Sequence, residues 1–271
     1  MAHPKDVLKN LGASPLKALS QNFLTSPRWA EKLVEAFLQV GAFDEVWEIG
    51  PGLGALSEVL LKKTKKPVKL FELDKKLAAY LTNLFPHTPL FQGDFLEQNW
   101  ASLHSSDGKI AILSNLPYHL SSAMIFKMVE HKEKLSHFLF TFQKEFAERL
   151  TSPPGTKDFG ALTLITEIHF NVSSLGTLPP GAFYPPPSVS SQALLFIPKK
   201  NHPEEQKLTA LIKAGFKHRR KKMAGNLKEA YPDYPWESFV QNLGLSPGVR
   251  AETLNLIQFE NLLNEMNNYI K

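Results

Sequence analysis

Residues 45–57 read EVWEIGPGLGALS, and this stretch decides the fold class. The short run Glu45–Ile49 favours a buried strand, and an amphipathic helical pattern begins at Ala55. The three glycines between them alternate, so the backbone can turn tightly and approach a ligand closely. Their spacing, G-x-G-x-G, differs from the G-x-G-x-x-G of dinucleotide-binding turns. Taken alone, the glycines are also compatible with a plain tight turn.

Strand-like and helical patterns alternate over most of the chain. The alternation predicts a parallel sheet with helices on both faces. After the segment PKKNHP at 198–203 the pattern is helical only. We therefore expect an α/β domain over residues 1–200, which starts with a loose basic arm at 1–20, and a small all-helical domain over 201–271. The segments expected as further strands are Val68–Leu73, Thr88–Phe91, Lys109–Leu113, His137–Phe142, Ala161–Phe170 and Gln192–Ile197, and those expected as helices are Lys75–Phe85, Ser122–His131 and Gln143–Leu150.

Acidic residues lie at or just after the carboxyl ends of the next two strand-like segments. Glu72, at the carboxyl end of the second strand, can accept hydrogen bonds from both ribose hydroxyls of a nucleoside. Asp94, after the third strand, can accept from an adenine amino group. Each acid alone is equally compatible with a helix N-cap, but with the glycine turn the two indicate an adenosine site. Because the chain has no P-loop lysine motif, S-adenosylmethionine, which carries no phosphate, suits this site better than a triphosphate.

The fourth strand-like segment leads into Asn115-Leu116-Pro117-Tyr118. An adenine amino nitrogen is a poor nucleophile because its lone pair is delocalised, and acceptors for its two hydrogens direct that lone pair toward a methyl donor. We assign the Asn115 side-chain oxygen as one acceptor and a backbone carbonyl beside Pro117 as the other. Tyr118 offers a face on which an extruded base can stack. Phe183 or Tyr184, before three prolines, is a candidate for the other face, although an ordinary core aromatic is equally compatible.

Composition excludes several classes of protein. The 271 residues include no cysteine, which excludes disulfides and cysteine-ligated zinc, and the nine histidines show no metal-ligand spacing, so we expect no metal. No apolar run approaches the roughly 20 residues of a membrane helix, and no signal peptide is visible. We therefore expect a cytoplasmic protein.

The excess of positive charge, +5 in total, is concentrated near the C-terminus. Between Gln206 and Lys228 there is no Asp or Glu, while eight Lys and Arg side chains are present. A solvated helix face is one explanation, and a surface for the phosphates of RNA is the other. The candidate RNA contacts are Lys217, Arg219, Arg220, Lys221 and Lys222, which we call the basic block.

In this order the motifs resemble those of the rRNA adenine N6,N6-dimethyltransferases, and among them the bacterial small-subunit (16S) enzymes. The resemblance extends from about residue 17 to residue 265. It is carried by SQNFLTSP (20–27), WEIGPGLGALS (47–57), FELD (71–74), QGDFLE (92–97), SNLPYHLSS (114–122), FTFQKEFAERL (140–150), GAFYPPPSVSSQALLFIP (181–198), FKHRRKKMAGNL (216–227) and GLSPGVRAETL (244–254).

The resemblance implies a Rossmann-like S-adenosylmethionine-dependent methyltransferase domain followed by a small helical domain that binds RNA or the ribosome. It implies dimethylation of two adjacent adenines in a hairpin near the 3′ end of 16S rRNA, during biogenesis of the small subunit, and we expect a monomer. The family's cofactor contacts fall on Asn22, Leu24, Gly50, Glu72, Asp94 and Asn115, and its target-adenine contacts on Asn115, Leu116, Tyr118 and Phe183. The chain departs from the usual family pattern at Ala161, Thr163, Ser188 and Ser190.

Three other functions share part of the pattern. A large-subunit rRNA adenine methyltransferase of the macrolide-resistance type more often carries Asn-Ile-Pro-Tyr, and Leu116 argues against it. A non-catalytic ribosome-assembly or nucleic-acid-binding factor does not need Glu72, Asp94 and Asn115 intact. The spacing of the glycines argues against a nicotinamide dehydrogenase.

Overall fold

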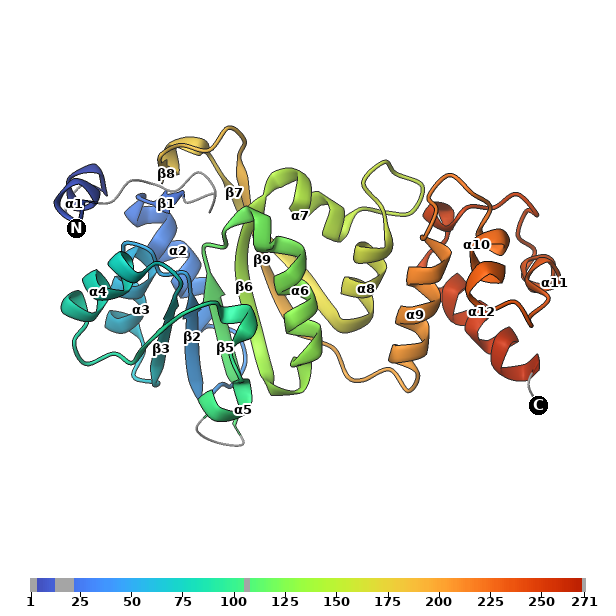
Figure 1. Ribbon diagram of the computed structural model, residues 1–271, viewed down its shortest axis with the longest axis horizontal. Helices are drawn as coiled ribbons and strands as arrows, with labels where there is room; N and C mark the ends of the chain where they lie inside the picture. Colours follow the sequence, from blue (N-terminus) through green and yellow to red (C-terminus); the bar gives the residue numbers. More distant parts are fainter. Residues whose placement is uncertain (1–3, 13–21, 105–107, 270–271) are drawn as a thin grey trace. The chain divides into compact units, whose positions relative to one another are not determined.

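The computed structural model describes residues 4–12, 22–104 and 108–269, and within these ranges the chain divides into two units (Figure 1). The first unit contains Met1–Ala147 and Asn171–Pro198, and the second contains Glu148–Phe170 and Lys199–Lys271. The segment Glu148–Phe170 therefore groups with the C-terminal helices, although two strands of the sheet follow it in the chain.

The first unit is built on a seven-stranded sheet (Figure 1). Its strands β2, β3, β4, β5 and β6 are parallel, and β9 is antiparallel to β6. The chain passes outward from β2 through β3 to β4 and then returns to β5 on the other side of β2, which creates a topological switch point between β2 and β5. In spatial order the strands are β4 (Leu90–Gln92), β3 (Val68–Glu72), β2 (Glu45–Ile49), β5 (Ile110–Ser114), β6 (Leu135–Gln143), β9 (Ser191–Pro198) and β7 (Phe170–Leu178).

Helices cover both faces of this sheet, because its strands are apolar on both sides. On one face α2 and α3 bury Leu33, Phe37 and Leu60 in a cluster with the sheet. On the other face the ring of Trp47 lies 4.9 Å from that of Trp100. The helices and short 3-10 turns of this unit are α1 (Pro4–Asn10), α2 (Pro27–Leu38), α3 (Ala55–Lys63), α4 (Lys75–Leu84), η2 (Phe95–Glu97), α5 (Trp100–Leu103), η3 (Tyr118–Leu120), α6 (Ser121–Glu130), η4 (Lys132–Lys134), η5 (Pro180–Ala182) and the first residues of α7 (Lys144–Thr151).

The N-terminal segment, for which the sequence predicts a loose arm over residues 1–20, is partly helical. Pro4–Asn10 forms α1, whose Leu8 is buried against Phe23, Leu53 and Leu77. Residues 1–3 and 13–20 lie outside the described ranges. A two-stranded antiparallel pair, β1 (Phe23–Leu24) with β8 (Phe183–Tyr184), joins the segment after the arm to the region of the triple proline.

The prediction of a strand at Ala161–Phe170 is wrong, since Ala161–His169 forms helix α8 in the second unit. Six of its nine residues are buried, so the helix is apolar around most of its circumference, and such a run has no clear period to separate it from a buried strand. The first turn is capped, because the backbone N–H of Gly160 donates to the Thr163 hydroxyl at 3.1 Å. The strand that follows, β7, begins only at Phe170.

The second unit is helical apart from its loops. Its core includes Leu211 of α9 and Phe259 of α12, and the ring of Phe216 lies 6.1 Å from that of Phe259. Phe216, which directly precedes the basic block, thus packs into this unit. The helices are α8, α9 (Glu205–Gly215), α10 (Met223–Ala230), α11 (Trp236–Asn242), η6 (Ala251–Thr253) and α12 (Leu256–Tyr269).

None of the helices in the described ranges is long and apolar enough to cross a membrane. In the same ranges, no group of three or more His, Cys, Asp or Glu side chains is placed to hold a metal ion.

Candidate functional site

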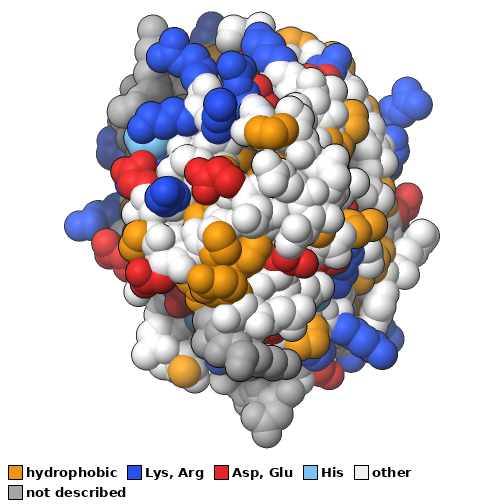
Figure 2. Space-filling view, turned by 90° about the vertical axis from the view of Figure 1, so that its right-hand side faces the viewer, with side chains coloured by type: hydrophobic (Ala, Val, Ile, Leu, Met, Phe, Trp, Pro, Cys, Tyr) orange, Lys and Arg blue, Asp and Glu red, His pale blue; other side chains and the backbone are white. Residues whose placement is uncertain are grey.

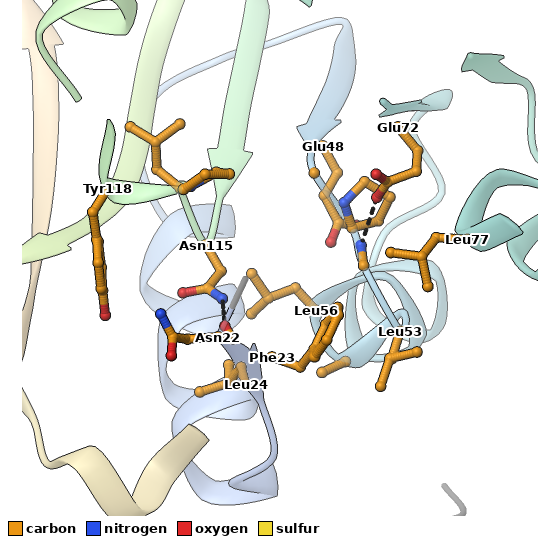
Figure 3. Close-up of a pocket in the computed structure, with 16 residues that line it drawn as sticks. Asn22, Phe23, Leu24, Glu48, Leu53, Leu56, Glu72, Leu77, Asn115 and Tyr118 are labelled. Carbon is orange, nitrogen blue, oxygen red and sulfur yellow. Dashed lines mark hydrogen bonds between the residues drawn. The ribbon is translucent and has the colours of Figure 1, made fainter. Parts of the chain in front are cut away.

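A pocket lies at the carboxyl ends of β2, β3 and β5, at the switch point of the sheet (Figure 3). A second hollow adjoins it and shares Gly50, Glu72 and Pro117 with it. The first is lined by Asn22, Phe23, Leu24, Glu48, Gly50, Pro51, Gly52, Leu53, Ala55, Leu56, Glu72, Leu77, Asn115, Leu116, Pro117 and Tyr118. Besides the three shared residues, the second is lined by Ile49, Phe71, Leu73, Gly93, Asp94, Phe95, Leu96, His119, Leu120 and Met124.

The glycine turn between β2 and α3 forms the floor of the first pocket. Gly50, Gly52 and Gly54 all have positive φ angles, of 63°, 60° and 84°, which side chains with a Cβ rarely adopt. A Cβ on Gly52 would also lie 2.9 Å from the ring of Phe23, in β1. The turn therefore needs glycine for its conformation and for the close approach of β1.

Glu72 ends β3 and is 5% exposed. One carboxylate oxygen accepts from the backbone N–H of Gly52 at 3.0 Å, and the other accepts from that of Asp74 at 3.0 Å. Burial raises the pKa of this carboxyl, and the two N–H groups oppose the shift. The bond to Gly52 joins the acid to the glycine turn, so the two motifs predicted separately form one structure.

Glu48 is a pocket residue that the sequence analysis missed. It lies two residues before the first glycine and is 1% exposed, and its Oε2 atom has no hydrogen-bond partner among the described residues. Burial raises the pKa of Glu48 to about 8. The negative charge of Glu72 raises this pKa further, whereas hydrogen bonds from Ser57 lower it. An unpaired buried acid in a pocket wall is a group that a bound cation would satisfy.

Asp94 forms a helix cap, one of the two roles that the sequence left open, and it also lies in the wall of the second hollow. Its Oδ1 atom caps η2 by accepting from the backbone N–H of Leu96 at 2.9 Å. Its side chain also lines the second hollow, beside Leu73 and Pro117. The cap fixes the orientation of the carboxylate and leaves its other oxygen available to a ligand.

Asn115 follows β5, and both ends of its amide are engaged. Its Nδ2 atom donates to the backbone carbonyl of Asn22 at 2.9 Å, and its Oδ1 atom accepts from the Thr141 hydroxyl at 2.7 Å. Asn115 thus connects the segment before β1 with the sheet. An amide oxygen has two lone pairs, so one remains for a ligand.

The other predicted target-site residues lie at different depths. Tyr118 lines the pocket, and its hydroxyl lies 2.7 Å from that of Ser191. Leu116 is 2% exposed and lines the same pocket. Phe183 is 4% exposed, lies in the hydrophobic core with Leu24, and is not among the residues that line either hollow.

The basic block divides into paired and unpaired cations. Lys217 pairs with Glu229 at 2.7 Å, and Arg219 pairs with Glu252 at 2.9 Å and also donates to the carbonyls of Lys157 and Phe159. The remaining three cations are exposed and have no ion pair among the described residues: Arg220, Lys221 and Lys222. Figure 2 shows Lys and Arg side chains gathered at the upper edge of the face that it presents.

The polar groups around the two hollows suit a nucleoside that carries a cation and no phosphate. The walls supply two buried carboxyl groups, Glu48 and Glu72, whereas none of the described lining residues is Lys or Arg. The apolar side chains of Leu73, Leu96 and Met124 in the second hollow suit the flat faces of a base.

Glu72→Ala is expected to weaken binding of S-adenosylmethionine by about 10- to 100-fold, since a hydrogen bond to a charged group contributes roughly 1.5–3 kcal/mol. Glu72→Gln is expected to weaken it too, because one end of the amide would place an N–H₂ group against a backbone N–H donor. Isothermal titration calorimetry measures both effects. Unchanged affinity in the two variants would refute the role of Glu72 in holding the ribose.

The chain matches one protein family model and is similar in sequence to curated relatives over most of its length. Residues 15–268 match the family model described as ribosomal RNA adenine dimethylase. Ribosomal RNA small subunit methyltransferase A of Syntrophotalea carbinolica is 35% identical over 258 residues, which cover 92% of this chain and 95% of the relative. The protein of the same name from Treponema denticola is also 35% identical, over 272 residues that cover 95% of this chain and 92% of the relative.

Two crystal structures share the fold. A dimethyladenosine transferase from Plasmodium falciparum superposes with a TM-score of 0.76 at 22% identity, covering 91% of this chain and 98% of that structure. The 23S rRNA methyltransferase ErmE superposes with a TM-score of 0.69 at 20% identity, covering 91% and 100%. These likenesses confirm the prediction of a Rossmann-like domain followed by C-terminal helices.

Proposed function

The chain belongs to the ribosomal RNA adenine dimethylase family, and from this premise we propose that it transfers methyl groups from S-adenosylmethionine to the N6 amine of two adjacent adenines near the 3′ end of small-subunit rRNA. The observation that carries the proposal is the position of Asn115. Asn115 lines a pocket whose glycine turn and buried acids suit an adenosine with a positive charge. We further propose that the protein acts as a monomer on the assembling subunit.

Glu72, Glu48 and Asp94 would hold the cofactor. Glu72, fixed by the N–H groups of Gly52 and Asp74, accepts from the ribose hydroxyls, and Asp94 accepts from the amine of the adenine. Glu48, which has an unpaired oxygen, faces the cationic part. When bound, S-adenosylmethionine supplies a methyl group attached to a sulfonium, which is strongly electrophilic.

The chain's own residues orient the target amine. Asn115 offers the second lone pair of its oxygen to one amine hydrogen. The carbonyl of Pro117 already accepts from the N–H of Leu120 at 3.0 Å, whereas the carbonyl of Leu116 has no such partner among the described residues. We assign the Leu116 carbonyl as the second acceptor, because both of its lone pairs are available, whereas one lone pair of the Pro117 carbonyl is taken. The two acceptors turn the nitrogen lone pair toward the methyl group, so catalysis is mainly orientation and electrostatics.

The ring of Tyr118 provides one face for the extruded base, and stacking of this kind contributes roughly 1–3 kcal/mol. The resemblance to the family implies that Phe183 stacks on the other face of the base. In this structure the side chain of Phe183 is buried with Leu24. For Phe183 to stack on a base, the β1–β8 pair would have to shift.

Binding of S-adenosylmethionine is expected to release up to about one proton from Glu48 near pH 7. In the free protein the raised pKa of about 8 keeps this carboxyl protonated, and a bound cation favours the ionised form. Affinity should therefore rise as the pH increases toward 8. Calorimetry in two buffers of different ionisation enthalpy measures the release.

Glu48→Gln separates this release from titration of the cofactor's own amino group. The variant should bind more weakly and should lose the buffer dependence that Glu48 causes. The same buffer dependence in the parent and the variant would contradict the assignment of Glu48.

The proposed function is tested with small subunits purified from a strain that lacks this methylation. The protein and S-adenosylmethionine with a labelled methyl group are incubated with small or large ribosomal subunits. We expect label in small-subunit rRNA and none in large-subunit rRNA. Label in the large subunit alone would instead support the macrolide-resistance type of activity.

A further inference from the structure

Two buried hydroxyl groups lie behind the Asn115–Tyr118 segment, on neighbouring strands. Thr141 is in β6 and Ser191 is in β9, and the side chains of both are fully buried. The two strands pair antiparallel, with Phe142 opposite Gln192. Thr141 donates to the Asn115 oxygen at 2.7 Å, and Ser191 shares a hydrogen bond of 2.7 Å with the hydroxyl of Tyr118. Each of the two polar side chains of the segment therefore has one hydroxyl partner in the sheet.

The hydrogen bonds fix which end of the Asn115 amide points where. The carbonyl of Asn22 can only accept, so the N–H₂ end of Asn115 must face it, and the oxygen must then face Thr141. The hydroxyl of Thr141 is the donor in this arrangement. A reversed amide would set its oxygen against the Asn22 carbonyl and would offer N–H groups to a target amine that needs acceptors.

We propose that Thr141 and Ser191 are positioning residues for methyl transfer, which act through Asn115 and Tyr118. Thr141 holds the Asn115 oxygen in place and leaves its second lone pair for the adenine amine. Ser191 anchors the outer end of the Tyr118 ring through the phenol. The inference rests on the proposed function, because it assumes that Asn115 accepts from the target amine.

The size of the rate decrease expected without the Thr141 hydroxyl depends on the side-chain torsion of Asn115 that this hydroxyl restrains. The last torsion of an Asn side chain has broad minima, so an amide held only at its N–H₂ end, by the Asn22 carbonyl, moves more freely than one held at both ends. In Thr141→Val the shape of the buried side chain is kept while the donor is lost, and the oxygen of Asn115 loses its anchor in the sheet. The loss of one such bond corresponds to a rate decrease of up to about tenfold.

The test compares Thr141→Val with Thr141→Ser, which restores a hydroxyl, and with Thr166→Val as a matched control. Thr166 is fully buried in α8, and its hydroxyl has no partner among the described residues, so this control removes a buried hydroxyl of the second unit. For each variant we would measure the single-turnover rate, the affinities for S-adenosylmethionine and for the small subunit, and the melting temperature.

Thr141→Val is expected to lower the single-turnover rate by about tenfold and to leave both affinities within about twofold of the parent. Thr141→Ser should recover most of the rate, and Thr166→Val should retain it. A parental rate in Thr141→Val would overturn the proposal for Thr141. A loss that Thr141→Ser fails to recover would also overturn it, because shape rather than the hydroxyl would then matter.

Ser191 is tested with Tyr118→Phe in a double-mutant cycle, which remains informative even if Thr141→Val folds poorly. Ser191→Ala should slow methyl transfer in the parent but have little further effect in Tyr118→Phe, because the shared hydrogen bond is already absent. Independent, additive effects would overturn the proposal for Ser191. If the parent itself methylates no adenine, the proposed function fails; if the parent is active and these variants match it, only the positioning role fails.

Discussion

Asn115→Ala is expected to lower the single-turnover rate of methyl transfer on the order of 100-fold, with little change in affinity for the small subunit. The substitution removes the oxygen that accepts from the target amine, and this interaction is stronger in the transition state than in the bound substrate. A 100-fold loss corresponds to about 2.7 kcal/mol of transition-state stabilisation. Rapid-quench measurement with enzyme in excess over subunits isolates the chemical step.

The same substitution also removes the hydrogen bond to Asn22, so its effect on the cofactor must be measured separately. Calorimetry measures the affinity of the variant for S-adenosylmethionine. A saturating concentration of the cofactor in the kinetic assay then keeps weaker binding from lowering the observed rate. A single-turnover rate equal to that of the parent would show that the amine is oriented by other groups, and the assignment of Asn115 would be wrong.

The triple variant Arg220→Gln, Lys221→Gln and Lys222→Gln is expected to weaken binding to the small subunit by at least about tenfold at low salt. These three cations are the exposed members of the basic block that form no ion pair among the described residues. Each phosphate contact that is lost should reduce the slope of log affinity against log salt by roughly 0.7–0.9, so a change of about two units is expected. Binding of S-adenosylmethionine should be unchanged.

The double variant Lys217→Gln and Arg219→Gln is the matched control from the same block. Both side chains pair with carboxylates of the second unit, Glu229 and Glu252, and Arg219 also donates to backbone carbonyls. We expect this variant to lower the melting temperature and to change the salt slope less than the triple variant does. If the triple variant leaves both affinity and slope unchanged, the block is not an RNA surface.

Much of the first unit follows from local sequence. The glycine turn, the acid at the end of β3 and the segment after β5 are each close in the chain to a short apolar strand, so their positions at one edge of the sheet could be predicted. The family assignment is confirmed by the match of residues 15–268 to the sequence model of the ribosomal RNA adenine dimethylase family.

Other features depend on contacts between distant residues and could not be predicted. Thr141 meets Asn115 across 26 positions, and Ser191 meets Tyr118 across 73, so neither hydroxyl carries a local signal. Glu48 lies within the strand predicted at Glu45–Ile49, and an acid in an apolar strand next to glycines is a signal for a buried functional group. The strand predicted at Ala161–Phe170 failed because α8 is buried on nearly all sides.

The division of the basic block is a similar case. The sequence shows five cations within six residues, and their mutual repulsion suggests a partner such as a phosphate backbone. In the structure Glu229 and Glu252 supply two of those partners from other segments of the same unit. The number of cations in the block that form no ion pair is therefore smaller than the sequence implies.

The most direct test of the central claim is to map the modified bases after reaction with unmethylated small subunits and S-adenosylmethionine. Mass spectrometry of rRNA fragments is expected to find N6,N6-dimethyladenosine at two adjacent positions in a hairpin near the 3′ end, and to find neither in a parallel reaction with Asn115→Ala at matched time. Small-subunit rRNA that stays unmodified with the parental protein, or that is modified at a base other than adenine, would contradict the account.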